Sequence, residues 1–386
     1  MSIPALVVRT FCPVARLIVD MNRRLFLGLP LLAYAKPQDL RTQIPIWMQY
    51  GSVPGAWVTV IERGKIVLAQ GFGVRNSETK QPVDSETIFD AASLTKQVTA
   101  YVAQALAKEG KLDFDKPLNA YVAALPDPVS KTVTARHVMS HSSGWPNWRN
   151  EKDQQLVPQF APGSAFRYSG EGYVYLSRVI EKVAEASFME LVQQRVFDPL
   201  AMASSSMVRR LDRADRMASG HNPKGEVRDG TVHLRFWELA KTKSKPVLSW
   251  RYEDVEAAMI EAGQPALPNM MIPNAAASMC TTGPDYAKFL LNAIKNPLLR
   301  ERVSTIREGK GWSLGWGLGW GVEQVAGRQF LWQWGDNGGY KAFVIVDPVA
   351  ESGVFVFTNG NNGQRLCDGI VTHAMGIEHP AILWLS

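Results

Sequence analysis

The sequence predicts an antiparallel β-sheet flanked by helices, with an inserted, mostly helical lobe. Strand-like runs occur at both ends of the 386-residue chain: two lie between residues 53 and 75, and three lie between 328 and 360. Residues 111–275, between these ends, show the patterns of helices and loops. Short turns join neighbouring strand-like runs, and hairpin connections of this kind produce antiparallel pairs.

Individual elements follow from local signals. The runs AWVTVIE and KIVLAQGFGV flank Arg63-Gly64, which predicts a β-hairpin. The stretch 91–110, AASLTKQVTAYVAQALAKEG, predicts a helix that ends at Gly110. A threonine cap followed by a proline predicts another helix over 281–295. RQFLWQWG, YKAFVIVDP and GVFVFTNG predict the C-terminal strands, and a last helix is expected at 363–376.

The N-terminus has the layout of a bacterial secretory signal. Residues 21–35, MNRRLFLGLPLLAYA, place two arginines before a short apolar run and a small-residue Ala-Tyr-Ala pattern. The arginine pair is similar to a twin-arginine signal. We therefore expect residues 1–35 to be a signal peptide, with 1–20 as an upstream extension if Met21 is the start. The mature chain would then be periplasmic or secreted, with no membrane span, because the apolar run is shorter than the ~20 residues that a span requires.

We expect residues 36–386 to form one domain. Its sheet lobe would comprise 36–110 and 276–386, and its helical lobe 111–275. A cleft between two such layers is the usual place for a small-molecule site.

Composition narrows the function classes. The formal net charge is +6, and the expected signal removes four arginines and one aspartate, so the mature chain is only mildly basic. Because no aromatic-basic stripe is present, we expect no nucleic-acid partner. The histidines show no metal-binding spacing, which predicts no metal, and we expect no cofactor. Cys280 and Cys367 are the cysteines of the mature chain, and two buried free thiols are the commoner outcome for such a pair.

Ser93 and Lys96 are the first candidate functional residues. They lie three positions apart at the start of the helix predicted over 91–110, so they share one face. A serine hydroxyl is a weak nucleophile until a neighbouring base takes its proton. A helix N-terminus also stabilises negative charge. On its own, a serine at a helix start is usually an N-cap, and a lysine one turn on is usually a solvated charge.

Three further stretches accompany this S-x-x-K pair. They are HSSGWPNW at 141–148, PGSAFRYSGEGYVYL at 162–176 and WQWGDNGGYKAF at 332–343. In this order and spacing, the four stretches resemble the serine β-lactamase and penicillin-binding-protein superfamily. The members closest in pattern are class C β-lactamases, D-alanyl-D-alanine carboxypeptidases and β-lactamase-like esterases. The resemblance covers residues from about 40 to 375, and it implies an α/β sandwich with an antiparallel sheet and a helical lobe.

The resemblance also implies a catalytic set. Ser93 would be the nucleophile, with Lys96 and Tyr168 as the acid–base pair. Which of the two carries the proton is left open by the sequence. The backbone N–H groups of Ser93 and Asp336 would form the oxyanion hole, which contributes on the order of 3 kcal/mol per donor. His141 is expected to form a turn and to hydrogen-bond rather than to act as a second base.

Two departures from the family pattern concern substrate binding. The family's Tyr-x-Asn has Gly170 as its third residue here, which removes an amide that could hold the lysine or a substrate carbonyl. Gln333-Trp334-Gly335 stands where the family carries Lys-Thr-Gly or His-Ser/Thr-Gly. A cation at that place would pair with a substrate carboxylate. Its absence, with Asp336 adjacent, predicts that neutral esters or amides bind better than anionic substrates.

Three hypotheses about function follow. The first is a serine hydrolase that forms an acyl-enzyme with a neutral ester or amide, most simply an esterase. The second is a β-lactamase or D-alanyl-D-alanine carboxypeptidase acting on a peptide-like substrate. The third is a binding or sensor module that keeps the fold without turnover. Trp312, Trp316 and Trp320, spaced by four within GWSLGWGLGW, are expected to be core or cleft-wall aromatics.

Overall fold

The computed structural model describes residues 37–122, 132–149, 156–228, 231–269 and 271–385. The predicted signal at 1–35 lies outside these residues. Contacts join the described residues into one compact unit. The described helices include none long and apolar enough to cross a membrane.

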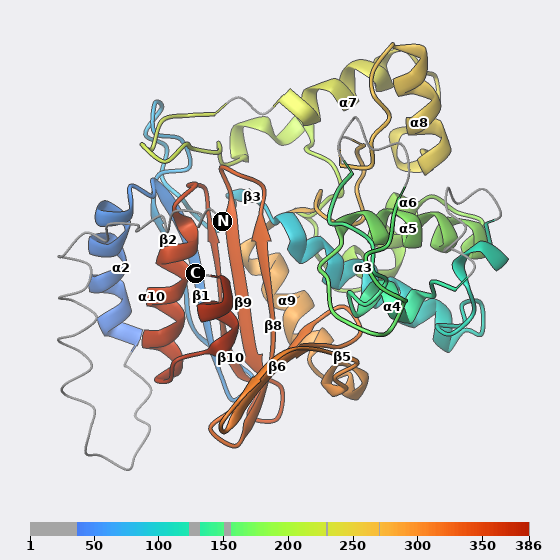
Figure 1. Ribbon diagram of the computed structural model, residues 1–386. Helices are drawn as coiled ribbons and strands as arrows, with labels where there is room; N and C mark the ends of the chain where they lie inside the picture. The colour runs from blue at the N-terminus through green and yellow to red at the C-terminus, as the bar shows by residue number, and fades with distance from the viewer. Residues whose placement is uncertain (1–36, 123–131, 150–155, 229–230, 270, 386) are drawn as a thin grey trace, which may run out of the picture. The chain divides into compact units, whose positions relative to one another are not determined.

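An eight-stranded antiparallel sheet forms the centre of this unit (Figure 1). Strands from the two ends of the chain are neighbours in this sheet, where β1 pairs with β10. A separate pair joins β3 (Ile88–Asp90) to β4 (Cys280–Thr282). In sheet order the eight strands are β2 (Lys65–Gly73), β1 (Gly55–Glu62), β10 (Ser352–Thr358), β9 (Lys341–Asp347), β8 (Arg328–Asp336), β7 (Gly321–Val325), β6 (Trp312–Trp316) and β5 (Ser304–Gly309).

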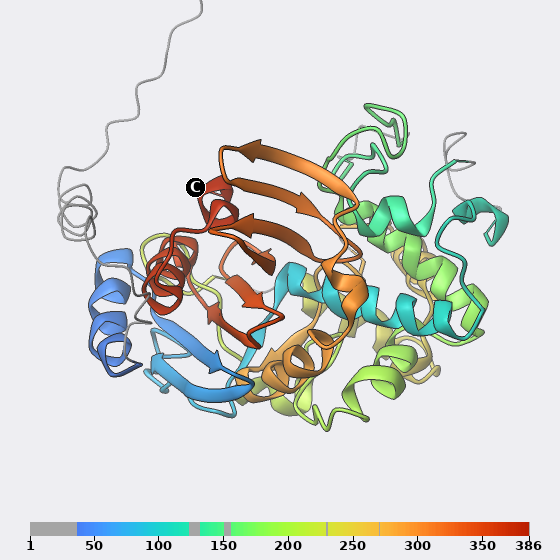
Figure 2. The same cartoon turned by 90° about the horizontal axis from the view of Figure 1, so that it is seen from below.

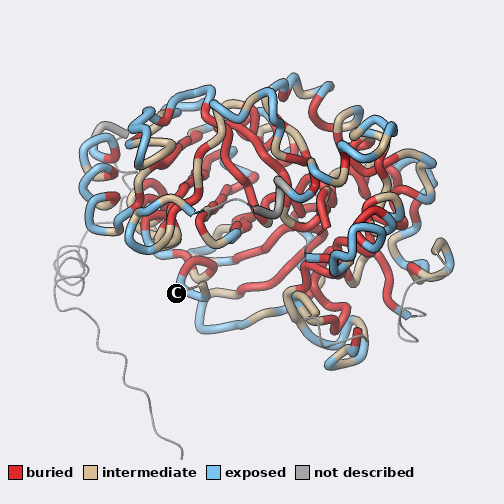
Figure 3. Tube along the Cα trace, turned by 90° about the horizontal axis from the view of Figure 1, so that it is seen from above, coloured by how far each residue is buried: buried red, intermediate tan, exposed pale blue. Residues whose placement is uncertain are grey.

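The predicted hairpin at Arg63-Gly64 is confirmed. Both turn residues have left-handed backbone, with φ of 50° at Arg63 and 72° at Gly64, as a two-residue hairpin of the primed type requires. The central strands β9 and β10 are buried throughout, because helices cover both faces of the sheet (Figure 3). This burial explains their nearly continuous apolar sequences.

One face of the sheet is covered by the two ends of the described chain. Helix α2 (Pro37–Gly51) packs beside α10 (Gly363–Met375), and α10 contacts β9 and β10 (Figures 1 and 2). The short helix α11 (Pro380–Leu385) contacts β6 and β7. Together they bury an apolar cluster against the outward side chains of the strands.

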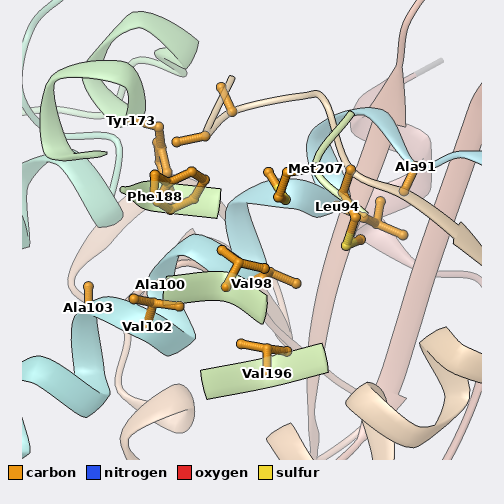
Figure 4. Close-up of a cluster of buried hydrophobic side chains, with 14 of the residues drawn as sticks. Ala91, Leu94, Val98, Ala100, Val102, Ala103, Tyr173, Phe188, Val196 and Met207 are labelled. Atoms are coloured by element: carbon orange, nitrogen blue, oxygen red, sulfur yellow. The ribbon is translucent and has the colours of Figure 1, made fainter. Parts of the chain in front are cut away.

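The other face packs against helices of the middle of the chain. Helix α3 (Thr95–Lys108) is buried along most of its length, and its apolar side chains pack with Tyr173, Phe188 and Val196 (Figure 4). Helix α9 (Gly283–Ala293) packs on β1, with Thr282 as its N-cap as predicted. The remaining α-helices on this side are α4 (Ala135–Met139), α5 (Gly170–Ala184), α6 (Phe188–Val192), α7 (Thr231–Lys241) and α8 (Tyr252–Glu261). The described parts of 111–275 contain no strand of the sheet, and the division into two lobes stays a prediction.

Strands β3 to β7 and the helices α2 and α11 were not among the predicted elements. Strands β5, β6 and β7 occupy 304–325, where glycines alternate with tryptophans and obscure the period-two pattern. Trp316 and Trp320 are buried there, as expected, whereas Trp312 is half-buried. Cys280 and Cys367 are buried free thiols.

Candidate active site

Ser93 lies in a tight turn just ahead of α3. The structure places it in a short 3₁₀ turn, Ala92–Leu94, rather than inside the α-helix itself. Ala92 has a left-handed φ of 46°, and the Asp90 carboxylate accepts a hydrogen bond from its N–H at 2.9 Å. Such backbone costs on the order of 1 kcal/mol and persists where surrounding contacts hold it. The turn fixes the direction of the Ser93 side chain.

Lys96 lies one turn further along and contacts Ser93 directly. Its Nζ is 3.0 Å from Ser93 Oγ and 3.0 Å from the carbonyl oxygen of Ala276. The side chain is buried, 1% exposed, and this burial lowers the pKa of Lys96 to about 7. A large fraction of Lys96 is therefore neutral near pH 7 and able to accept a proton.

The Ala276 carbonyl was not among the predicted site groups. It belongs to a segment, 274–279, that is anchored to the start of α3. Thr99 Oγ1 donates to Ala275 O at 2.6 Å, and Met279 N donates to Thr95 Oγ1 at 2.9 Å. These bonds fix the carbonyl beside Lys96. A backbone carbonyl is carried by every residue type, so the sequence held no signal for it.

Tyr168 approaches the site at an open edge of β8. In the described chain, pairing of β8 with β7 ends at Trp332, whereas pairing with β9 continues to Asp336. Tyr168 lies beside the part of β8 that no longer pairs with β7. Its hydroxyl accepts a hydrogen bond from Gln333 Nε2 at 3.3 Å, and its ring centroid is 4.3 Å from that of Trp334.

The protonation of Tyr168 differs from that of Lys96. Burial raises the pKa of Tyr168 above its ordinary value, and hydrogen bonds with Ser93 and Gln333 oppose this rise only in part. Lys96 Nζ lies 4.9 Å from the centroid of the Tyr168 ring. Tyr168 is therefore a neutral phenol near pH 7, close to a lysine that titrates there.

Gln333 connects the turn that carries Ser93 to Tyr168. Its Nε2 donates to Ser93 O at 2.9 Å as well as to the Tyr168 hydroxyl. The Ser93 carbonyl can only accept, so the amide nitrogen must face it, and the orientation of the Gln333 amide is fixed. A neutral amide thus occupies the position where the family that the sequence resembles carries a cation.

The backbone N–H groups predicted to form the oxyanion hole belong to the turn that carries Ser93 and to the last residue of β8. Asn337 N donates to Tyr340 O, so the ladder alternation turns the N–H of Asp336 away from β9 and toward the open edge of β8. The N–H of Ser93 lies in the first turn of its helical segment, where N–H groups lack a partner within the helix. Both donors thus lie at the junction of the turn and the strand edge.

Gly335 allows β8 to approach the turn that carries Ser93. A Cβ at this position would lie 2.7 Å from Ala91 O and 3.1 Å from Ala92 Cβ. The neighbouring side chains point to the other face of the sheet: Trp334 packs with Trp332 and Trp384, and Asp336 forms an ion pair with Lys341. The structure therefore corrects the expected effect of Asp336, because its charge is paired and faces away from Ser93.

His141 supports Tyr168 and the start of α5. Its Nδ1 accepts a hydrogen bond from Ser169 N at 3.1 Å, and its ring centroid is 4.1 Å from that of Tyr168. Burial holds the pKa of His141 well below its ordinary value, and the charge of Lys96 adds to this effect. His141 is therefore a neutral packing and hydrogen-bonding residue.

Gly170 lies beneath an indole. It is the first residue of α5, and a Cβ there would lie only 2.4 Å from Cζ2 of Trp148. Its N–H donates to Asn147 Oδ1 at 2.8 Å. The space beside this glycine is filled by Trp148. The described residues show no cluster of acidic, histidine and cysteine side chains able to hold a metal ion.

Comparison with known proteins identifies the family of the chain. A family model described as Beta-lactamase matches residues 47–370. Penicillin-binding protein 4* of Bacillus subtilis is 29% identical over 187 residues, which cover 42% of this chain and 41% of that protein. The match to this curated relative thus spans about two fifths of its length.

Solved structures share the fold. The octameric penicillin-binding protein homologue from Pyrococcus abyssi superposes with a TM-score of 0.68 at 22% identity, covering 88% of this chain and 78% of that chain. D-alanine carboxypeptidase AmpC from Burkholderia cenocepacia superposes with a TM-score of 0.65 at 18% identity, covering 88% and 99%. These likenesses confirm the predicted antiparallel-sheet and helix architecture. Since the family model spans well over half of its length, the chain belongs to the beta-lactamase family.

Proposed function

We propose that this chain is a serine hydrolase that forms an acyl-enzyme on Ser93 with a neutral ester or amide. The observation that carries the proposal is the 3.0 Å contact between Ser93 Oγ and the buried Nζ of Lys96. Family membership supports a hydrolase, and the intact set of Ser93, Lys96 and Tyr168 supports turnover over a purely binding role.

Lys96 is the general base in this mechanism. Its neutral amine takes the proton of Ser93 while Oγ attacks the substrate carbonyl carbon. The resulting oxyanion would be stabilised by the N–H groups of Ser93 and Asp336. The bond from carbon to the leaving oxygen or nitrogen then breaks, and the proton passes from Lys96 to the leaving group. Water then attacks the acyl carbon and gives a proton to Lys96, the bond from that carbon to Ser93 Oγ breaks, and the proton returns to Oγ as the carboxylic acid leaves.

Tyr168 would act as a proton relay. Its raised pKa makes the phenolate a poor choice for the resting base, whereas a neutral hydroxyl can donate one proton and accept another. Its hydroxyl is hydrogen-bonded to Gln333, and its ring packs against the tilted ring of His141. The phenol can therefore pass a proton between Lys96 and the leaving group.

Neutral substrates suit the surroundings of Ser93. Gln333 supplies an amide where a cation would pair with a carboxylate. We place the protein in the periplasm or outside the cell, on the strength of its N-terminal signal pattern and its bacterial relative. A β-lactamase or D-alanyl-D-alanine carboxypeptidase is the second candidate, favoured by the carboxypeptidase among the similar structures.

Probe labelling and a substrate panel test the proposal together. A fluorophosphonate probe should label Ser93, located by mass spectrometry of the digested protein, and Ser93→Ala should abolish both labelling and hydrolysis. The panel comprises short-chain nitrophenyl esters, a chromogenic cephalosporin and a D-Ala-D-Ala peptide. Full labelling of Ser93→Ala would overturn the assignment of the nucleophile. A preference for the cephalosporin or the peptide would favour the second candidate.

A further inference from the structure

The segment 146–149 is fastened across the start of α5. Ser169 Oγ donates to Pro146 O at 2.8 Å, and Glu171 N donates to Asn147 O at 2.9 Å. Arg149 N donates to a carboxylate oxygen of Glu171 at 2.9 Å, and the two side chains form a buried ion pair. Trp148 is therefore held between two bonded neighbours, so its position is built into the fold.

The same bonds occupy the N–H donors of the first turn of α5. Gly170 N and Glu171 N donate to the side chain and the carbonyl of Asn147, respectively, and Gly172 N donates to Ser169 Oγ at 3.1 Å. A helix N-terminus attracts anions when its N–H groups are open. Here these three donors are already satisfied, so this end of α5 offers no alternative partner for a substrate carboxylate.

The Trp148 indole takes the space of a missing side chain. At the position of residue 170, the family that the sequence resembles carries an asparagine, whose amide could hold the lysine or a substrate carbonyl. With glycine at this position, Cζ2 of Trp148 lies 2.4 Å from the place that Cβ would occupy. The indole and a side chain at residue 170 therefore exclude each other, and an apolar ring replaces a hydrogen-bonding amide two residues beyond Tyr168.

We propose that Trp148 is the specificity-determining residue for the acyl side of this hydrolase, which favours apolar acyl groups over groups that carry an amide beside the reacting carbonyl. The inference rests on the proposed function. An apolar acyl chain gains by contact with the half-buried ring, whereas an acylamino group loses the partner that an asparagine would supply.

Matched esters test this inference. The 4-nitrophenyl esters of butyrate and of N-acetylalanine share a leaving group and are both neutral. We expect the unmodified protein to prefer butyrate. Trp148→Ala should lower kcat/KM for butyrate about tenfold, because a contact of one or two methylene groups is worth such a factor. The double variant Trp148→Ala/Gly170→Asn should keep this loss and improve the acetylalanine ester about tenfold.

Gly172→Ala is the matched control on the same helix. Its Cβ would meet Ser169 and Val138 only at ordinary contact distances of 3.4 Å, so the ratio of the two esters should stay unchanged. Gly170→Ala, by contrast, should displace the indole and shift the ratio in the same direction as Trp148→Ala. An unchanged ratio in both Trp148→Ala and Gly170→Ala would overturn the inference.

Binding separates this inference from the proposed function. In a Ser93→Ala background, intact 4-nitrophenyl butyrate can be titrated by calorimetry, and adding Trp148→Ala should weaken its binding about tenfold. Equal affinities would overturn the role of Trp148 whatever the turnover. Weaker binding of butyrate, with no hydrolysis of any ester by the unmodified protein, would overturn the proposed function and leave the role of Trp148 supported.

Discussion

The two halves of the site follow the family pattern to different degrees. The base half, Ser93 and Lys96, keeps the S-x-x-K residues in direct contact. The recognition half, Gly170 and Gln333, departs from the pattern at both positions and replaces an amide and a cation with an indole contact and a neutral amide. Acyl transfer needs a fixed nucleophile and base, whereas the choice of substrate depends on the groups around them. The function that we propose therefore combines the family's acyl-transfer chemistry with a different choice of substrate.

Removal of the base should have the largest effect on the comparison. Lys96→Ala and Tyr168→Phe should each lower kcat about 10²–10⁴-fold, the usual scale for lost acid–base catalysis. Their effects should be far from additive, because the two residues act on one proton. Lys108→Ala, at the exposed end of the same helix, should retain full activity. Unchanged acylation and deacylation rates in Tyr168→Phe would remove Tyr168 from the mechanism.

Gly335→Ala should damage both halves at once. The added Cβ would lie 2.7 Å from Ala91 O and would push β8 away from the turn that carries Ser93. A misplacement of about 1 Å costs about 10²-fold in rate. Thermal unfolding and ester hydrolysis measure the two consequences separately. Gly369→Ala in α10, where a Cβ meets Trp47 at an ordinary 3.5 Å, is the control. A fully active, fully stable Gly335→Ala protein would contradict the close approach of strand and turn.

The pH dependence tests which group in the base half takes the proton. Burial lowers the pKa of Lys96 to about 7, and only the neutral amine is a base. We therefore expect kcat/KM to rise with pH through about 7 and to level off above it, falling about tenfold per unit on the acid side. A tyrosine base would place the rise at strongly alkaline pH, since burial raises the pKa of Tyr168. A flat profile between pH 5.5 and 9 would exclude Lys96.

The recognition half can be changed with one substitution of smaller effect. Gln333→Lys would place an ammonium where the amide now contacts Ser93 O and the Tyr168 hydroxyl. Charge-assisted hydrogen bonds are about twice as strong as neutral ones, so anionic substrates should gain about tenfold relative to neutral esters. The measurement is kcat/KM for a penicillin against nitrophenyl butyrate. If the unmodified protein already hydrolyses both equally well, another group supplies the positive charge.

Much of the fold was accessible from the sequence. The family resemblance is confirmed by the match to the family model. The predicted sheet and helices are also confirmed, and they could be predicted because turn residues and helix caps are local signals. Strands β5, β6 and β7 were not predicted, since their glycines and tryptophans suit several local structures. These segments form strands because they pair with one another and with β8. Such pairing depends on the tertiary structure.

The candidate site shows the same limit. The proximity of Ser93 and Lys96 follows from helical spacing alone. The Ala276 carbonyl lies beside Lys96 because of tertiary contacts, and the residue type at 276 does not indicate them. The exclusion between Trp148 and a side chain at residue 170 likewise requires the loop and α5 to be packed together.

The Ala276 contact has a consequence for how the protein reaches its active form. Lys96 and Ala276 are 180 residues apart in the chain, and Gln333 and Ser93 are 240 apart. Contacts between such distant residues incur a large loop-closure entropy, and they slow folding. Activity should therefore appear late during refolding, after most helical signal has returned. Recovery of ester hydrolysis would then report on completed folding more stringently than circular dichroism does.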